Sequence, residues 1–454
     1  MIQGGSWVKK ILIANRGEIA LRIMDTCHQM GIETVAVYSD ADSEMPFVKQ
    51  ATYAFNIGEP AVNKSYLRAE TILEIAKSEG VDGIHPGYGF LSENAAFARA
   101  VNEAGITFIG PDPDTIDLMG DKIVSRKTMM DAGVPVVPGS EEGTSTLEEA
   151  SRLAESMGYP VMLKASGGGG GIGMVRCENE QALAKSFGST KARAKAYFGS
   201  EEVFVEKYID NARHIEVQVF GDHYGNIVHL FERDCSIQRR HQKVVEESPS
   251  PFLSNSAKQK MYETAIRAAE AVNYKNAGTI EFIVDEQENF YFLEMNTRLQ
   301  VEHPVTEQIT GLDLVKWQIL VSRGEKLPLA QTEIQQKGHA IEFRLYAEDP
   351  RSFLPSPGKM EEFQWKEFQG VRVDSGYASS STVTPYYDPM IAKCIIYGDT
   401  RKDSLERAGH FFKELIITGI KTNAPLFKEI IKDPDFINGN YSTSFLTNKT
   451  FIAN

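Results

Sequence analysis

The chain has 454 residues, a net charge of −14, and apolar and charged fractions of 42% and 24% that are ordinary for a globular protein. Its acidic balance argues against a nucleic-acid-binding protein, and no apolar run reaches the roughly 20 residues of a membrane span. The length predicts two or three domains.

The cysteines and the N-terminus indicate the compartment. None of Cys27, Cys177, Cys235 and Cys394 has a Cys-x-x-Cys or zinc spacing, which favours a reducing environment. The first residues lack the apolar core of a signal peptide. We therefore expect a cytoplasmic protein with neither a nucleic-acid nor a membrane partner.

Strands and helices alternate in the first part of the chain, which predicts a parallel sheet with helices on both faces. The first turn, Asn15–Glu18, contains one glycine and is not a dinucleotide fingerprint. Residues 111–120 are expected to form a linker. The expected strands are 10–14, 34–38, 81–85 and 107–109, and the expected helices are 19–30, 66–79 and 93–104.

A second unit is expected to begin near Asp121 and a last one near Gly338, with strands that pair mainly antiparallel. The expected helices of these units are 121–132, 146–157, 257–272 and 401–415. The expected strands are 160–164, 203–207, 214–221, 227–232, 279–284, 290–295, 339–346, 371–374 and 392–397.

A glycine run, Gly167–Gly173, follows a strand that ends with Lys164. Glycine lets the backbone approach a ligand closely and point several N–H groups at it, and the lysine is placed to meet a phosphate. The run has neither the Walker nor the kinase spacing. A lid over a nucleotide is the favoured interpretation, and a flexible hinge is the alternative.

Two acids, Glu281 and Glu294, lie inside strands that should be half buried. A buried carboxylate is costly unless it is paired or bound to a metal. With Asn296 they form an all-oxygen set suited to Mg²⁺ bridging phosphates. Structural salt bridges are the alternative.

Residues 294–302 read Glu-Met-Asn-Thr-Arg-Leu-Gln-Val-Glu, so polar side chains occupy every second position. In a strand they would share one face over roughly 27 Å, which exceeds one small site, so we expect a bend near Arg298. Arg298 and Gln300 suit an anion. Glu302, beside Arg298 and Lys243, should have a lowered pKa and could act as a base, or could form a structural ion pair.

Residues 239–243, Arg-Arg-His-Gln-Lys, are the densest basic cluster. In a continuous strand Arg239, His241 and Lys243 would share one side, which favours an anion site over a solvated surface. Cys235 is expected to be a packing residue.

These motifs together resemble the ATP-grasp superfamily and, more narrowly, the biotin carboxylases. The resemblance covers nearly the whole chain and includes 13–20, 85–94, 119–122, 232–243, 294–304 and 385–388. It implies an α/β and α+β ATP-grasp fold. A Rossmann-like N-terminal domain would span 1–119, an ATP-grasp domain 120–325 with a lid at about 138–207, and a mixed C-terminal domain 338–446.

The resemblance also implies a reaction, in which ATP phosphorylates bicarbonate and carboxyphosphate delivers CO₂ to biotin. Glu302 matches the base and Arg344 the cation that stabilises the biotin enolate, while Mg²⁺ or Mn²⁺ would be held by Glu281, Glu294 and Asn296. The positions matching the ATP site are Lys122, Lys164, Gly168, Gly169, Gly170, Gly171, Glu206, Lys207, Ile209, His214, Gln238 and His241. Those matching the bicarbonate site are Lys243, Arg298, Gln300 and Val301.

Some positions depart from the family pattern. Ile172 stands where a cation is usual in the glycine loop, Leu345-Tyr346 replaces Ile-Asn, and Pro389 replaces a serine. Asp25 and Gln29 replace a charged pair of the helix that helps to form the family's homodimer, so the expected dimer would lack those ion pairs.

The resemblance implies partners as well. No Met-Lys-Met biotin-attachment motif occurs, so we expect biotin on a separate carrier protein, with carboxyltransferase subunits completing the reaction. The complex could serve fatty acid biosynthesis as an acetyl-CoA carboxylase, or another acyl-CoA or pyruvate carboxylase. Two alternatives remain open: an ATP-grasp ligase of the carbamoyl-phosphate-synthase type, and a non-catalytic nucleotide-binding regulatory subunit.

Overall fold

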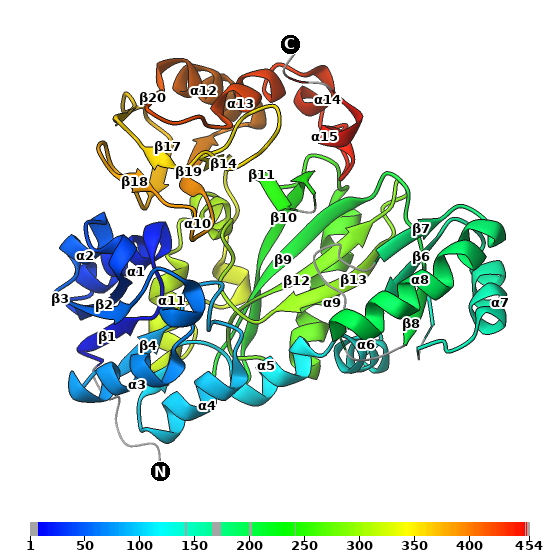
Figure 1. The fold of residues 1–454 in the computed structure, drawn as a ribbon, viewed down its shortest axis with the longest axis horizontal. Coiled ribbons are helices and arrows are strands. Elements are labelled where there is room, and N and C mark those ends of the chain that lie inside the picture. Colours follow the sequence, from blue (N-terminus) through cyan, green and yellow to red (C-terminus); the bar gives the residue numbers. More distant parts are fainter. Residues whose placement is uncertain are drawn as a thin grey trace.

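The fold is built around one large antiparallel sheet, with smaller units at both sides (Figure 1). A computed structural model describes residues 8–140, 143–165, 174–198, 202–240, 242–449 and 451, and the side chains of 165 and 196–198 are not described. In Figure 1 the N-terminal unit lies on the left and the C-terminal unit runs across the top, and the unit that carries α7 (Leu147–Met157) and α8 (Glu180–Phe198) projects to the right.

The N-terminal unit contains the expected parallel sheet, in the order β3-β2-β1-β4-β5. The apolar runs of β1 and β4 are buried, with Ile11, Leu12 and Ile84 fully inaccessible. The edge strand β3 was missed, because its alternation is weak and half exposed. The strands of this unit are β1 (Lys10–Ile13), β2 (Glu33–Ser39), β3 (Tyr53–Gly58), β4 (Gly83–His85) and β5 (Thr107–Phe108), and its helices are α1 (Gly17–Gln29), α2 (Pro46–Gln50), α3 (Ala69–Ser78) and α4 (Ala95–Glu103).

The linker predicted at residues 111–120 is wrong, because most of it forms helix α5 (Pro113–Gly120). Pro113 occupies the first turn, where its fixed φ suits a helix and its missing N–H costs nothing. Ile116 and Met119 are three residues apart and buried, a helical spacing that the flanking prolines and glycines concealed.

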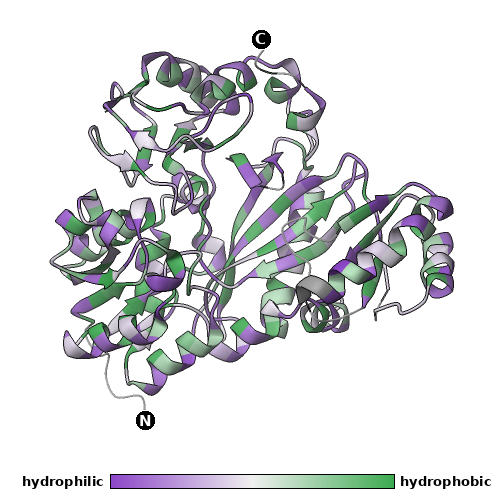
Figure 2. Cartoon of the chain, viewed as in Figure 1, coloured by the Kyte–Doolittle hydropathy of each residue, from purple (hydrophilic) through white to green (hydrophobic). Residues whose placement is uncertain are grey.

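The large sheet has the order β13-β12-β9-β10-β11-β14-β19-β17 and joins strands from the second and last units. Its strands alternate between apolar and polar stretches, which are visible as green and purple along the central ribbons (Figure 2). The strands are β9 (Arg213–Gly221), β10 (Ile227–Arg239), β11 (Gln242–Ser248), β12 (Asn276–Val284), β13 (Phe290–Asn296), β14 (His339–Tyr346), β17 (Val371–Ser375) and β19 (Met390–Gly398).

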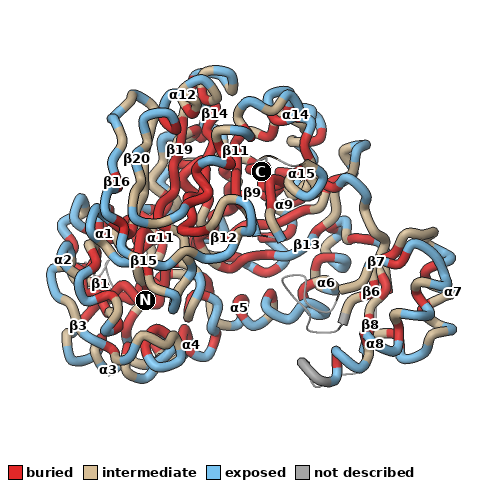
Figure 3. The backbone as a smooth tube through the Cα atoms, turned by 45° about the horizontal axis from the view of Figure 1, so that its top comes forward, coloured by how far each residue is buried: buried red, intermediate tan, exposed pale blue. Residues whose placement is uncertain are grey.

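Helices cover both faces of this sheet. On one side α12 packs on β14 and β19, where the fully buried Phe343 meets the rings of Phe412 and Phe427. Buried residues therefore concentrate in the central strands, while the outer helices are largely exposed (Figure 3). The helices are α6 (Lys122–Asp131), α9 (Asn255–Ala271), α10 (His303–Thr310), α11 (Leu314–Ser322), α12 (Arg401–Glu414), α13 (Ala424–Ile430), α14 (Pro434–Ile437) and α15 (Phe445–Asn448).

The projecting unit is a three-stranded sheet, β7-β6-β8, with α7 and α8 packed on it. It has its own small apolar core, in which Val161, Leu163 and Val205 are fully buried. The predicted glycine run lies outside the described residues, between β6 and β7. The elements are β6 (Val161–Ala165), β7 (Met174–Cys177), β8 (Val203–Lys207), α7 (Leu147–Met157) and α8 (Glu180–Phe198).

Smaller pieces complete the last unit. They are β15 (Gly358–Lys359), β16 (Glu362–Gln364), β18 (Thr382–Val383) and β20 (Ile416–Thr418), which form two short antiparallel pairs.

Candidate active site

A cavity of about 820 Å³ opens where the N-terminal, central, projecting and C-terminal units meet. Most of the side chains that were predicted to bind a ligand line it. They are Lys122, Lys164, Glu206, His214, Gln238, Lys243, Glu281, Glu294, Asn296, Arg298, Gln300, Val301 and Arg344. These predicted side chains therefore meet around one cavity, although they span more than two hundred positions, whereas Glu302 is not among the residues that line it.

Four charged residues lie directly opposite one another across four strands of the large sheet. Arg233 on β10 pairs in register with Glu216 on β9, Glu216 with Glu281 on β12, and Glu281 with Glu294 on β13. We call these four residues the transverse row. Like charges in such cross-strand positions repel each other, so the three acids require counter-charges.

Lys243 supplies the central counter-charge. Its Nζ lies 2.5 Å from Glu216, 2.8 Å from Glu281 and 2.7 Å from Glu302. Burial lowers the pKa of an amine, but here the three carboxylates outweigh it and hold the pKa of Lys243 well above its ordinary value. The lysine is therefore a permanent cation at the floor of the cavity.

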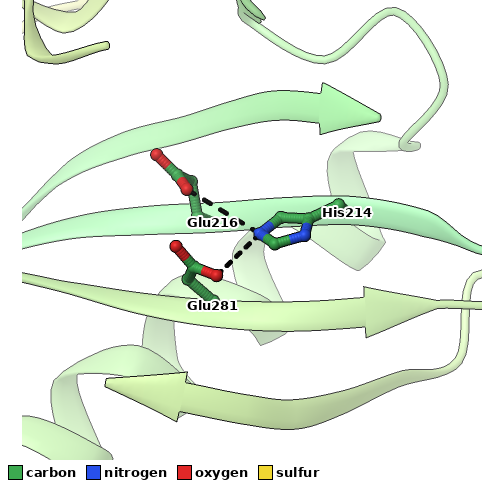
Figure 4. Close-up of side chains that lie close together, drawn as sticks. All are labelled: His214, Glu216 and Glu281. Atoms are coloured by element: carbon green, nitrogen blue, oxygen red, sulfur yellow. Dashed lines mark ion pairs between the residues drawn. The ribbon is translucent and has the colours of Figure 1, made fainter. Parts of the chain in front are cut away.

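The transverse row has further partners. The fully buried Arg233 donates from Nε to Glu216 over 2.5 Å, and His214 Nε2 lies 2.8 Å from Glu281 and 3.9 Å from Glu216 (Figure 4). Burial opposes protonation of His214, but Glu281 outweighs it and raises the histidine pKa. The cluster thus interleaves positive and negative groups across neighbouring strands.

Glu302 is fully buried and held by two cations. Besides Lys243 it accepts a hydrogen bond of 2.9 Å from Arg344 Nη2. Burial raises the pKa of Glu302, but Lys243 and Arg344 outweigh it, so the pKa lies well below its ordinary value. The predicted lowering is confirmed, but the second cation is Arg344 and not Arg298.

The predicted metal-binding acids lie side by side. Glu281 and Glu294 are opposite partners on β12 and β13, and Asn296, one alternation further along β13, donates to Glu281 over 2.9 Å. Burial and the neighbouring Glu281 raise the pKa of Glu294. Repelling carboxylates beside an amide oxygen are the donor set of a hard divalent cation, so the residues fit Mg²⁺ or Mn²⁺.

The predicted bend in residues 294–302 is present. Strand β13 ends at Asn296, and Glu302 is the N-cap residue of α10. Arg298 crosses the bend, donating to Gln300 over 2.8 Å, to Asn296 over 3.0 Å and to Glu93 of the N-terminal unit over 3.0 Å. The polar side chains therefore face one basin because the chain turns, and not because a long strand presents them.

The prediction that residues 239–243 form one strand is wrong. Arg240 has a φ of 49° and starts a tight turn, so Arg239 pairs with Gln242 and Gln238 pairs with Lys243. Lys243 consequently shares a face with Gln238, while Arg239 forms an ion pair with Glu348 elsewhere. His241 lies outside the described residues.

On the projecting unit, Lys164 forms an ion pair with Glu206 at the cavity. Lys207 points away from it, because its Nζ donates to the carbonyl oxygen of Gly158 over 2.8 Å. Ile209 is half buried and does not line the cavity. Gly168, Gly169, Gly170, Gly171 and Ile172 lie outside the described residues.

Sequence reasoning missed several contributors. Glu216 and Arg233 received no role, although their alternation with His214 and Gln218 on neighbouring strands was a usable signal. Tyr88 and Tyr387 also line the cavity, from loops where no periodicity could indicate them. Cys235 is buried, and burial raises its pKa, consistent with the expected packing role.

Comparison with protein families covers most of the chain. Residues 7–116 match "Biotin carboxylase, N-terminal domain" and residues 342–448 match "Biotin carboxylase C-terminal domain". Residues 121–330 match "Carbamoyl-phosphate synthase L chain, ATP binding domain". The central match alone would suit the alternative ligase, but the two flanking matches favour a biotin carboxylase.

Individual relatives are similar over nearly their full length. The biotin carboxylase of Halalkalibacterium halodurans is 56% identical, with 97% of both chains covered. Biotin carboxylase 2 of Bacillus subtilis is 55% identical, with 96% of this chain and 98% of that protein covered. A crystal structure of the biotin carboxylase domain dimer of Hydrogenobacter thermophilus 2-oxoglutarate carboxylase, in complex with MgADP, ADP and bicarbonate, superposes with a TM-score of 0.92 at 47% identity and covers 97% of each chain.

The fold and site define an ATP-grasp enzyme, an ATP-dependent carbon–nitrogen ligase. More narrowly, the chain belongs to the biotin carboxylase family. The predicted fold class, family and reaction type are confirmed. Of the helices in the described part of the chain, none has the length and apolar character needed to cross a membrane.

We predict that Lys243→Ala reverses the pH dependence of stability on the acidic side of neutrality. In the wild type the pKa values of Glu281 and Glu302 are lowered, so they stabilise the fold at neutral pH, and this contribution disappears as the pH falls through their folded pKa values. Without the lysine these pKa values should rise above their unfolded values, so acid should relieve the repulsion.

Thermal unfolding measured between about pH 5 and 8 tests this expectation. The deficit of Lys243→Ala relative to wild type should be largest at pH 8 and shrink towards pH 5. Lys258→Ala, which removes a smaller buried pair with Glu232, is the control. A deficit that stays constant with pH would contradict the electrostatic explanation.

Proposed function

We propose that this protein catalyses the ATP- and bicarbonate-dependent carboxylation of biotin carried by a separate protein, through carboxyphosphate. The observation that supports it most is the convergence of Lys243 and Arg344 on the buried carboxylate of Glu302, beside the Glu281–Glu294 pair. One cavity would then hold a base, anion-binding cations and metal ligands.

Nucleotide binding is assigned to the residues on the projecting and central units. Lys122, Lys164 and the glycine loop would meet the phosphates. Glu206 at the end of β8 would meet the adenine, and Lys207 and Ile209, whose side chains do not line the cavity, would contribute through their backbone. His214, Gln238 and His241 would complete the site. Mg²⁺ bound by Glu281, Glu294 and Asn296 would supply charge neutralisation for phosphoryl transfer.

Glu302 is the proposed base for bicarbonate. Its ionised carboxylate can accept the bicarbonate proton, and the resulting oxyanion would then attack the γ-phosphorus. Lys243, Arg298, Gln300 and the Val301 backbone would orient the anion beside it. Because the cations that lower the pKa of Glu302 also face the substrate, binding and base ionisation are coupled.

Arg344 is the proposed partner of biotin. Carboxyphosphate would yield CO₂ and phosphate, and the phosphate would accept the ureido proton, which leaves an enolate-like anion on biotin that attacks the CO₂. A guanidinium that is fixed by Glu302 and Glu246 can stabilise that anion without reorganising. Carboxyphosphate would decompose in water, so a projecting unit that closes over the cavity is part of this proposal. Tyr346 and Pro389, which depart from the family pattern, would shape the biotin pocket.

The partners and domain roles are proposed more broadly. The three segments 1–119, 120–325 and 338–446 would act as one catalytic polypeptide that works with a biotin carboxyl carrier protein and a carboxyltransferase. A homodimer is expected, by analogy with the dimer of the 2-oxoglutarate carboxylase domain. The complex would carboxylate acetyl-CoA, another acyl-CoA or pyruvate, and we expect the protein in the cytoplasm.

ADP release from Mg-ATP and bicarbonate, with and without free biotin, tests the function. We expect release that biotin stimulates. Release that ignores biotin would favour a carbamoyl-phosphate-synthase type of ligase, and no release at all would favour a non-catalytic regulatory protein.

We predict that Glu302→Gln abolishes turnover, by at least about a hundredfold, because the amide cannot accept the bicarbonate proton. ATP binding, measured by calorimetry, should change little, since Glu302 is fully buried and is not among the residues that line the cavity. Glu361→Gln, the same change on an exposed side chain that does not line the cavity, is the control. Unchanged turnover in Glu302→Gln would remove Glu302 from the role of base.

We predict that Arg344→Ala lowers the rate of biotin carboxylation more than the rate of ATP hydrolysis in the absence of biotin. A transition-state contact to biotin alone would give this asymmetry, of about tenfold or more. Arg344→Lys should recover part of the loss. Equal losses in both reactions would indicate a structural arginine.

A further inference from the structure

Two glutamates lie opposite each other directly behind Arg344. Glu246 on β11 and Glu342 on β14 are partners in the antiparallel register, and both are fully buried. They belong to the side of the sheet that carries Arg344, two residues along β14 from Glu342. Neither has been given a role in the proposed reaction.

The two carboxylates have unequal partners. Glu246 lies 2.5 Å from Arg344 Nε in an ion pair. No oxygen of either carboxylate has a hydrogen-bond partner among the described residues, so Glu342 lacks a hydrogen bond and also the ion pair that Glu246 has. A buried ionised carboxylate with neither kind of partner is strongly disfavoured, so Glu342 is a poor site for a negative charge.

The electrostatic environment of Glu342 is set by charged and titratable groups on every neighbouring element. The nearby cations are Lys393 on β19 and Arg344 on β14, whereas Glu246 on β11 and Glu302 at the start of α10 add negative charge. Lys393 is already held by Glu18 at 3.1 Å and by the Val301 carbonyl at 3.0 Å.

Two neutral groups complete the surroundings. His303 at the start of α10 has its pKa well below the ordinary value, because it is buried and lies near Lys393. The Cys394 thiol of β19 has a raised pKa, through burial and the nearby Glu342. Neither therefore supplies the missing positive charge.

We propose that Glu246 and Glu342 retain one proton between them, so that the pair carries a single negative charge and Arg344 faces two carboxylate charges in place of three. Glu342 is then a positioning residue that sets the charge of the biotin-facing arginine. If both acids were ionised, Arg344 would face three carboxylates, those of Glu246, Glu302 and Glu342.

The titration behaviour of the pair supports this arrangement. Burial raises the pKa of Glu246 to about 7 even though Arg344 opposes the shift, and burial together with Glu246 raises the pKa of Glu342 well above its ordinary value. Two acids in one buried site lose their protons in separate steps that belong to the pair. The second ionisation should therefore occur on the alkaline side.

The retained proton does not depend on the proposed function, but its effect on kinetics rests on the proposed contact between Arg344 and biotin. Loss of the retained proton would add a negative charge behind Arg344 and weaken its attraction for an anionic ligand. The KM for biotin should therefore rise on the alkaline side, while the KM for ATP should not follow it.

Infrared spectroscopy of the full chain without ligands tests the retained proton independently of activity. The wild type minus Glu342→Gln difference spectrum at neutral pH should contain the carbonyl band of a protonated carboxyl group, shifted in D₂O and fading at alkaline pH. Glu361→Gln, at an exposed position, is the matched control and should leave no such band. A difference spectrum without the band would overturn the proposal, whatever reaction the protein catalyses.

Kinetics supply the second test. Glutamine resembles the protonated acid, so Glu342→Gln should keep the KM for biotin within about threefold of wild type at neutral pH and should abolish its alkaline rise. A larger increase at neutral pH would show that an ionised carboxylate is needed and would overturn the proposal. If the variant fails to fold, the wild type remains informative: a KM for biotin that does not change with alkaline pH would also overturn it.

Discussion

The contact of one lysine with three buried glutamates is the constraint on which the rest of the site depends. Lys243 touches Glu216 and Glu281 on neighbouring strands and Glu302 at the start of α10. Each buried ion alone would cost several kcal/mol, so the cluster is tolerated only when all of its members are in place. The Lys243 amine therefore depends on two features at once. The sheet register aligns Glu216 with Glu281, and the bend after β13 places Glu302 beside them.

The cluster also explains how a strongly acidic site can receive anions. Besides Lys243, each of its three glutamates has a second cationic group within ion-pairing distance: Arg233 for Glu216, His214 for Glu281 and Arg344 for Glu302. Glu294, by contrast, is an acid whose pKa is raised by burial and by Glu281. The excess negative charge at Glu294 and Glu281 suits a divalent cation. The neighbouring lysine and arginine side chains suit phosphate and bicarbonate.

Many of the helices and strands could be predicted from the sequence, because the spacing of apolar residues reflects which side of an element is buried. The helix that became α1 and the strand that became β14 follow from apolar spacing alone, and the polar alternation from Glu294 to Glu302 indicated the basin. Predictions failed where a single residue changes the chain direction: Pro113 starts a helix inside an expected linker, and Arg240 adopts a positive φ inside an expected strand. The partners of Glu216 could not be predicted either, because cross-strand register depends on the whole sheet.

The large sheet passes without interruption from β13 to β17, and the β11–β14 ladder joins its central and C-terminal halves. Dividing the chain between these halves would leave β11 as an edge strand with unpaired backbone groups, which favours aggregation. It would also separate Arg344 from Glu302. The large sheet therefore has to be kept whole for the site to form. The projecting unit, by contrast, has a sheet and an apolar core of its own. In chimaeras of related enzymes, the projecting unit should therefore be exchangeable as a piece, whereas one half of the large sheet should not.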